Sequence, residues 1–286
     1  MVLSPAAIFL YLIAKLQFMK KLFTLILILL TIALQYSCKK DDNGTPAAKR
    51  NLKSITSSGQ SIISYTYDND DRIVQSKFNY GSGIIITSDY NYVNGKLSTI
   101  KPDLHVVPYK RYEYDNNGVL TSISIFETYP DNKKLYRKFE LTYNAQGKLS
   151  KKVELDADLI RIMNVLTFQY NADGLLSKIH VVSNEFNKTG DITIENYSDE
   201  CNFDSYAVID FVAFSDYFSP ELFIDAKRLP VKFNYLFDDG TKLNRENVFV
   251  IKNKQLISFA SATTETFKYN GELRTTEYNW SYNFNY

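Results

Sequence analysis

A tyrosine followed by a turn motif recurs along the chain and constrains the fold more than any other feature. The copies read YDNDDRI from Tyr67, YVNGKL from Tyr92, YDNNGVL from Tyr114, YNAQGKL from Tyr143, YNADGLL from Tyr170 and YNGEL from Tyr269. Consecutive tyrosines of the first five copies lie 25, 22, 29 and 27 residues apart, which is about the length of two strands and two turns. Each copy is therefore predicted to be one β-hairpin unit.

The segments between the turns alternate between apolar and polar residues. In YRKFELTYN and LTFQYN, every second residue is aromatic or aliphatic, and the residues between them are polar or charged. A period of two with many aromatic residues is typical of half-buried strands. The sequence therefore predicts an all-β fold: an antiparallel meander of β-hairpin repeats, twisted or curled into a half-barrel-like sheet, with one short helix or loop insert.

The turn chemistry can be derived from the motif. Asn or Asp stands at the first position of a type I turn, and a glycine at the fourth position supplies the positive φ that closes the hairpin. The predicted turn glycines are Gly95, Gly118, Gly147, Gly174 and Gly271. In the Tyr67 copy Asp71 replaces the glycine, and the left-handed conformation tolerates aspartate. After the glycine, apolar residues follow three apart, as in Leu97 and Ile100, which breaks the period of two and predicts a β-bulge.

The repeat pattern is lost between about residues 197 and 228. Apolar residues are spaced irregularly there, and Pro220 ends any helix. We expect a short helix or ordered loop that covers one edge or end of the sheet. The C-terminal YNWSYNFNY is either a last strand or an exposed aromatic patch, and its alternation favours a strand.

The N-terminus has the charge pattern of an export signal. Residues 1–37 contain no acid, and their only charged residues are Lys15, Lys20 and Lys21. From Met19 the chain has a basic start and an apolar run from Leu22 to Leu34, followed by a small residue and Cys38. Thirteen residues are too few to cross a hydrocarbon core, which needs about 20 in helix. We predict a signal peptide over residues 1–37, with Met19 as the true start.

The residues around Cys38 resemble a bacterial lipoprotein signal. LQYSC resembles a lipobox, in which the chain is cut before the cysteine and the cysteine is acylated, although Gln35 stands where such boxes usually carry leucine. The charged residues Lys39, Lys40, Asp41 and Asp42 resemble the export tag of surface-exposed lipoproteins of Bacteroidetes. The resemblance implies an outer-membrane, surface-exposed protein held by lipid on Cys38, since two or three acyl chains anchor a protein essentially irreversibly. The alternative is a buried cysteine beside a charged turn.

The repeat itself resembles the YD-type repeats of Rhs-like proteins. A closer resemblance is to a group of Bacteroidetes lipoproteins of unknown function, over residues 60–180 and 233–275. The segment AKRLPVK at residues 226–232 resembles the SKNLPTK segment of that group. Long Rhs-type arrays enclose a cargo, and six or seven hairpins are expected to be too few for such a shell. We predict a lipidated tether at residues 38–50 and one repeat-built β domain at residues 51–286.

Composition excludes some classes of function. Removing residues 1–37 takes away three lysines and no acid, which lowers the formal net charge from +1 to −2. A nucleic-acid binder relies on clustered cations, so no nucleic-acid partner is expected. If Cys38 is acylated, Cys201 is the only other cysteine and forms no intrachain disulfide.

No sequence motif for catalysis, cofactor binding or metal binding is present, so we assign no catalytic, cofactor or metal residues. His105 and His180 are expected to face solvent on strands or loops. The acidic clusters at residues 68–71 and 238–239 are compatible with calcium but fit turn chemistry better, since neither has alternating ligand spacing. Cys201 is expected to be a small buried or loop residue.

These observations favour a non-enzymatic binding or interaction module attached to the membrane through Cys38, with a glycan or an envelope protein as ligand. One alternative is a glycan-processing or glycan-binding accessory protein that uses exposed tyrosines or carboxylates of the insert. Another is a structural envelope protein. The tyrosines themselves have two interpretations, stacking on sugar rings or cross-strand packing, and their regular spacing favours packing.

Overall fold

The computed structural model describes residues 51–79, 83–104, 107–127, 134–212, 220–223, 226–269 and 272–286. The chain separates into two units, Met1–Lys49 and Arg50–Tyr286, and the second contains all the described residues. The predicted signal peptide, Cys38, the tag at residues 39–42 and the tether lie outside the described residues, as do Gly271 and His105.

The described chain is built from strands, as predicted. In chain order they are β1 Ser54–Ser57, β2 Gln60–Tyr67, β3 Ile73–Asn79, β4 Ile85–Val93, β5 Lys96–Pro102, β6 Tyr109–Tyr114, β7 Leu120–Phe126, β8 Leu135–Tyr143, β9 Leu149–Leu155, β10 Ile162–Tyr170, β11 Leu176–Ser183, β12 Lys188–Tyr197, β13 Pro230–Phe237, β14 Lys242–Lys252, β15 Gln255–Tyr269 and β16 Glu272–Asn285.

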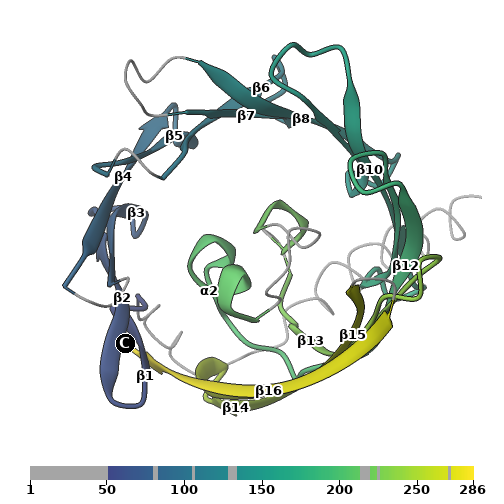
Figure 1. Ribbon diagram of the computed structural model, residues 1–286. Coiled ribbons are helices and arrows are strands. Elements are labelled where there is room, and N and C mark those ends of the chain that lie inside the picture. The colour runs from purple at the N-terminus through teal and green to yellow at the C-terminus, as the bar shows by residue number, and fades with distance from the viewer. Residues whose placement is uncertain are drawn as a thin grey trace, which may run out of the picture. The chain divides into compact units, whose positions relative to one another are not determined.

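The strands form an up-and-down antiparallel meander that closes into a barrel (Figure 1). Each strand pairs with the next, and β16 pairs with β1, with Ile55 opposite Phe284. The C-terminal aromatic segment is therefore the last strand, as its alternation predicted. The predicted curling of the sheet is also confirmed, and it continues until the barrel is closed.

Alternation along many strands separates a mostly apolar inner face from a mostly polar outer face, whereas β9 and β14 bury charged residues such as Glu154 and Arg245. In β10, Leu166 and Phe168 are buried, whereas Thr167 and Gln169 are exposed. In β16, Phe284 and the other aromatic residues alternate with exposed polar residues in the same way. Because period two places successive side chains on opposite faces, the sequence pattern alone selects which residues line the lumen.

The turns have the geometry that the motif predicts. Gly147 has φ +74°, and its N–H donates to the carbonyl of Asn144 at 2.9 Å. The Asn144 side chain accepts hydrogen bonds from the backbone N–H groups of Gln146 and Lys148. Asp71 takes the place of the glycine with φ 60°. The other described turn glycines, Gly95, Gly118 and Gly174, have φ between 75° and 78°.

The predicted bulges are present opposite the repeat tyrosines, where the pairing register shifts between the tyrosine and the residue before it. Tyr114 pairs with Leu120 and Tyr112 pairs with Ile123, so one extra residue is accommodated on the second strand of the hairpin. The same register shift occurs in the hairpins that end in Tyr67, Tyr92, Tyr143 and Tyr170. The spacing of three after the glycine therefore keeps both apolar residues on the inner face.

The insert enters the barrel rather than covering an edge. It contains α2 (Ser205–Val212) and the 3-10 helix η1 (Pro220–Phe223). Figure 1 shows α2 within the ring of strands, and the hydroxyl of Tyr65 donates to the carbonyl of Ala207 at 2.9 Å. The predicted short helix is thus confirmed. Of the two predicted positions, an edge or an end of the sheet, the edge is excluded because a closed barrel has no free edge. A sixteen-strand barrel is too wide for wall side chains to fill, and the insert supplies the missing core.

No helix in the described part of the chain is long and apolar enough to cross a membrane.

Candidate functional site

The meander places the repeat turns together at one end of the barrel. Turns 68–72, 94–95, 115–119, 144–148 and 171–175 each follow an even-numbered strand, and the insert follows β12. We call this end, with the tyrosines that precede the turns, the tyrosine end. The sixth sequence copy, at Tyr269, ends the odd-numbered strand β15 and therefore lies at the opposite end, so it does not continue the array.

The tyrosines form a ladder of hydrogen bonds around the inner wall. With the exception of Tyr143, each hydroxyl donates to a backbone carbonyl. That carbonyl lies at the start of the preceding hairpin's second strand or, for Tyr67, in the N-terminal segment. The pairs are Tyr67–Leu52 at 2.8 Å, Tyr92–Ile73 at 3.0 Å, Tyr114–Leu97 at 2.9 Å, Tyr170–Leu149 at 2.8 Å, and Tyr197–Leu176. Sequence reasoning missed Tyr197 as a rung because no turn motif follows it. Its spacing of 27 residues from Tyr170 was the available signal.

Cations from one hairpin cover tyrosine rings of the next. Arg72 lies 5.0 Å from the centre of the Tyr92 ring, Lys96 lies 5.4 Å from Tyr114, and Lys148 lies 5.1 Å from Tyr170. Each of these cations directly follows its turn glycine, or Asp71 in the first hairpin. These rings are therefore held by their hydroxyl groups and covered by cations, which supports the packing interpretation of the repeat tyrosines rather than sugar stacking.

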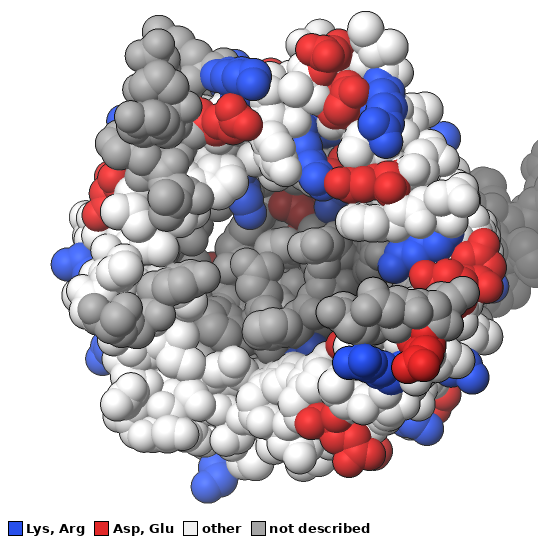
Figure 2. All heavy atoms as spheres, viewed as in Figure 1, with Lys and Arg blue, Asp and Glu red and all other residues white. Residues whose placement is uncertain are grey.

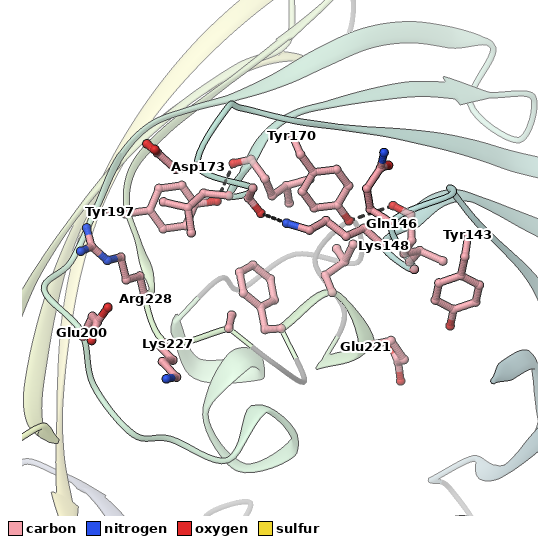
Figure 3. Close-up of a pocket in the computed structure, with 18 residues that line it drawn as sticks. Tyr143, Gln146, Lys148, Tyr170, Asp173, Tyr197, Glu200, Glu221, Lys227 and Arg228 are labelled. Atoms are coloured by element: carbon pink, nitrogen blue, oxygen red, sulfur yellow. Dashed lines mark hydrogen bonds between the residues drawn. The ribbon is translucent and has the colours of Figure 1, made fainter. Parts of the chain in front are cut away.

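A cavity of about 780 Å³ lies between the tyrosine end of β8–β12 and the insert (Figure 3). Its wall includes Tyr143, Tyr170 and Tyr197, and its opposite side is formed by η1 and residues 226–228. Leu222 and Phe223 of η1 provide apolar surface within it. A concave space with an apolar base and several polar side chains is the usual form of a ligand site.

Several charged and polar side chains of this cavity are free to meet a ligand. Within the part of the chain that the structure describes, they make no side-chain hydrogen bond or ion pair. They are Gln146 and Asp173 on the turns, and Glu200, Glu221, Lys227 and Arg228 on the insert. By contrast, Lys148 donates to the carbonyl of Gly174, and its ammonium group lies over Tyr170 of the ladder.

Burial keeps the tyrosine hydroxyl groups of the cavity protonated. Desolvation raises the pKa of Tyr143 to about 12, and the negative charge of Glu221 adds to this. Desolvation also raises the pKa of Tyr170 to about 12. These hydroxyl groups are thus neutral hydrogen-bond donors at physiological pH rather than bases.

The two acids of the insert that line the cavity among the described residues, Glu200 and Glu221, do not form a carboxylate pair. Figure 3 shows Glu200 and Glu221 on different sides of it. The carboxylate of Asp204 instead accepts a hydrogen bond from the backbone N–H of Tyr206 at 2.9 Å, which caps α2. No group of three or more potential metal ligands occurs among the described residues.

The other residues weighed in the sequence lie outside the cavity. His180 bonds to Asp191 at 2.8 Å on the outer face. Asp68 accepts backbone and side-chain hydrogen bonds from Arg72, which lower the pKa of its carboxyl group, and this is turn chemistry. Asp238 accepts a hydrogen bond from the backbone of Thr189. Cys201 is buried, and desolvation raises the pKa of its thiol to about 11.

Comparison with known proteins shows the fold. No protein-family model matches the chain, and no curated protein sequence matches it. A porin-like protein from Bacteroides uniformis has a TM-score of 0.50 at 16% identity, and the match covers 82% of this chain and 95% of that one. A porin-like protein from Bacteroides vulgatus has a TM-score of 0.37 at 15% identity, covering 82% of this chain and 98% of that one. The chain TcdB2-TccC3-TEV has a TM-score of 0.32 at 15% identity over 79% of this chain and 15% of that one.

Proposed function

We propose that this chain is a lipid-anchored protein of the outer membrane that acts as a non-enzymatic binding module, with the cavity at the tyrosine end as its ligand site. The proposal rests on the cavity. Polar side chains from the turns and from the insert line it and make no side-chain hydrogen bond or ion pair within the described residues. The fold shared with a Bacteroides porin-like protein and the lipobox-like residues around Cys38 support an envelope location.

The outer face of the barrel supports a position in water rather than in lipid. A membrane-spanning barrel needs an outward apolar band about 25 Å tall. Here the outward residues include ion pairs in the wall, with Lys178 at 2.8 Å from Asp191 and Lys232 at 2.7 Å from Glu195. The buried apolar side chains form the core, and exposed apolar residues such as Leu236 and Val248 also occur on the strands. The membrane connection is therefore assigned to the lipid on Cys38.

The charge distribution supports a partner other than nucleic acid. On the face of the molecule shown in Figure 2, acidic and basic side chains are interspersed. A nucleic-acid site would need a cluster of cations to displace counterions. A mixture of acids, cations, amides and apolar surface suits a polar organic ligand, such as a glycan or a segment of an envelope protein.

The anchor is tested by labelling cells with a radioactive fatty acid. Wild-type protein is expected to carry the label in the membrane fraction, and Cys38→Ala is expected to lose the label and leave the membrane. Cys201→Ala is the matched control and is expected to keep the label. Labelling that persists in Cys38→Ala would contradict the anchor.

The binding site is tested by screening residues 39–286 against surface glycans and isolated envelope proteins. A ligand found in this screen is expected to bind weakly to Lys227→Glu/Arg228→Glu, which changes the cavity, and normally to Lys134→Glu/Arg161→Glu, which changes exposed cations at the other end. Equal binding to both double variants would place the site elsewhere. A screen without any ligand would favour the structural envelope role.

A further inference from the structure

One rung of the tyrosine ladder lacks both of the contacts that define the others. The hydroxyl of Tyr143 makes no hydrogen bond within the described residues, whereas its counterparts in Tyr114 and Tyr170 donate to backbone carbonyls. No described cation covers the Tyr143 ring, because the residue that follows the preceding turn glycine is Val119 rather than lysine or arginine. Tyr143 therefore presents an uncovered ring and an unused hydroxyl to the cavity.

A carboxylate lines the same cavity as this ring. Glu221 is half-buried at the start of η1, lines the same cavity as Tyr143, and has no partner among the described residues. Its negative charge raises the pKa of Tyr143, and also contributes to the raised pKa values of Tyr114 and Tyr206. Three tyrosines, from β6, β8 and α2, therefore lie within electrostatic range of one carboxylate. Figure 3 shows Tyr143 and Glu221 on the same side of the cavity.

We propose that Tyr143 and Glu221 bind an organic ammonium group of a ligand, as found in a lysine side chain or an amino sugar. The inference rests on the proposed function of the cavity as a ligand site. A cation over an aromatic ring gains about 0.5–2 kcal/mol, more as it is desolvated. A hydrogen bond from an ammonium group to a carboxylate is stronger than a neutral one. Aromatic rings around a carboxylate combine both interactions.

The ladder shows that this wall accommodates ammonium groups. Lys96 places its ammonium over Tyr114 and donates to the carbonyl of Gly118 at 2.6 Å, and Lys148 repeats this arrangement at Tyr170. A ligand ammonium over Tyr143 would occupy the equivalent position one rung away. Val119 holds the backbone position of Lys148, since its N–H donates to Asp115 as that of Lys148 donates to Asn144.

The remaining charges restrict the ligand further. Lys227 and Arg228 also line the cavity, and Figure 3 shows them on the side away from Glu221. Their repulsion disfavours a small cation that is free to move through the cavity. The arrangement therefore selects a ligand with its ammonium group toward Glu221 and a neutral or anionic polar group toward the two cations.

Calorimetric titration of the full-length protein tests the inference with charged and neutral probes of matched shape. Nα-acetyl-lysine methylamide is compared with Nα-acetyl-norleucine methylamide, and glucosamine is compared with glucose. At least one ammonium probe is expected to bind about tenfold or more tightly than its neutral partner. Binding of the lysine probe alone or of glucosamine alone supports the site and identifies the source of the ammonium group. Equal affinity for charged and neutral probes would overturn the ammonium site and leave the cavity as a binding site.

Substitutions based on the lysines of the ladder test the proposed site more specifically. Val119→Lys is expected to place the lysine's own ammonium group over Tyr143. Binding of the ammonium probe is then expected to weaken about tenfold or more. Val248→Lys adds the same charge at an exposed position of β14 that does not line the cavity, and is expected to bind the probe like the wild type. Glu221→Gln removes the carboxylate charge from a half-exposed position and is expected to weaken binding similarly. Unchanged affinity in folded Val119→Lys and Glu221→Gln would overturn the inference.

Discussion

At the turn after β8, the backbone of Gly147 has φ +74°, and a Cβ added there would meet no atom within 4 Å. A substitution is therefore penalised by backbone conformation alone. Gly147→Val forces a β-branched residue to positive φ and is expected to lower the free energy of unfolding by about 1 kcal/mol or more. The shift in the urea midpoint measures this loss. Gly147→Asn is the control and should lose much less, because asparagine tolerates this conformation, as Asn94 and Asn253 do here.

Gly190 is required for a different reason. It lies in β12 between Val181 and Phe237, and a Cβ would approach a ring carbon of Phe237 to 2.4 Å and the carbonyl of Leu236 to 2.5 Å. Gly190→Ala is therefore expected to lower the free energy of unfolding by about 1–3 kcal/mol through overpacking. Partial recovery in Gly190→Ala/Phe237→Leu, measured by thermal unfolding, would support this cause. A stability equal to that of the wild type in the single variant would contradict it.

Local chemistry explains which residues could be predicted from the sequence. Asn144 and Gly147 act within one turn, so their roles follow from the motif alone. The uncovered ring of Tyr143 depends on Val119 in another hairpin and on Glu221 in the insert. The positions of Val119 and Glu221 relative to Tyr143 could not be derived before the barrel and the position of η1 were known.

At the level of the hairpins, the ladder provides a matched pair of variants. Tyr170→Phe removes the hydroxyl that donates to Leu149 and leaves that carbonyl without this partner. The expected loss in the free energy of unfolding is about 0.5–1.5 kcal/mol. Tyr143→Phe removes the same atom from a rung whose hydroxyl has no described partner, and little change is expected. Chemical denaturation of both variants distinguishes them, and equal losses would show that the hydroxyl bonds do not stabilise the ladder.

The hairpins were the most predictable elements, and the insert was the least. Alternation, turn residues and the spacing of three after each glycine all act within about 25 residues, so they predict strands, turns and bulges. The insert gave only irregular apolar spacing, which predicts a short helix but not its position. Its position in the lumen follows from the size of the barrel, which is a property of all sixteen strands together.

At the level of the whole barrel, closure depends on a short strand with little sequence signal. β1 contains only Ser54–Ser57, yet it joins β2 to β16. Ile55 is fully buried and is the only apolar residue in the strand. Four mostly polar residues do not predict a strand by alternation. The repeat therefore predicts a curled sheet, and the pairing of the two ends determines that it becomes a barrel.

Because desolvated tyrosines surround the lumen, the folded barrel is expected to lose stability at alkaline pH. Burial raises the pKa values of Tyr92, Tyr143, Tyr170 and Tyr286 from 10.0 to about 12. Between pH 10 and 12 the unfolded chain therefore loses protons that the folded chain keeps. Fewer bound protons in the unfolded state mean that the free energy of unfolding falls as pH rises. Below pH 10 the contribution of these groups to stability is fully present.

Two measurements test this expectation together. The urea midpoint, followed by far-ultraviolet circular dichroism, should be steady between pH 8 and 9.5 and fall progressively above pH 10. Tyrosinate absorbance should rise at higher pH in the folded protein than in the same protein unfolded in urea, and the absorbance assigns the effect to tyrosine rather than lysine. A urea midpoint that does not change up to pH 11.5, or equal tyrosinate titrations in the two states, would show that the lumen does not hold these hydroxyl groups in a desolvated, protonated form.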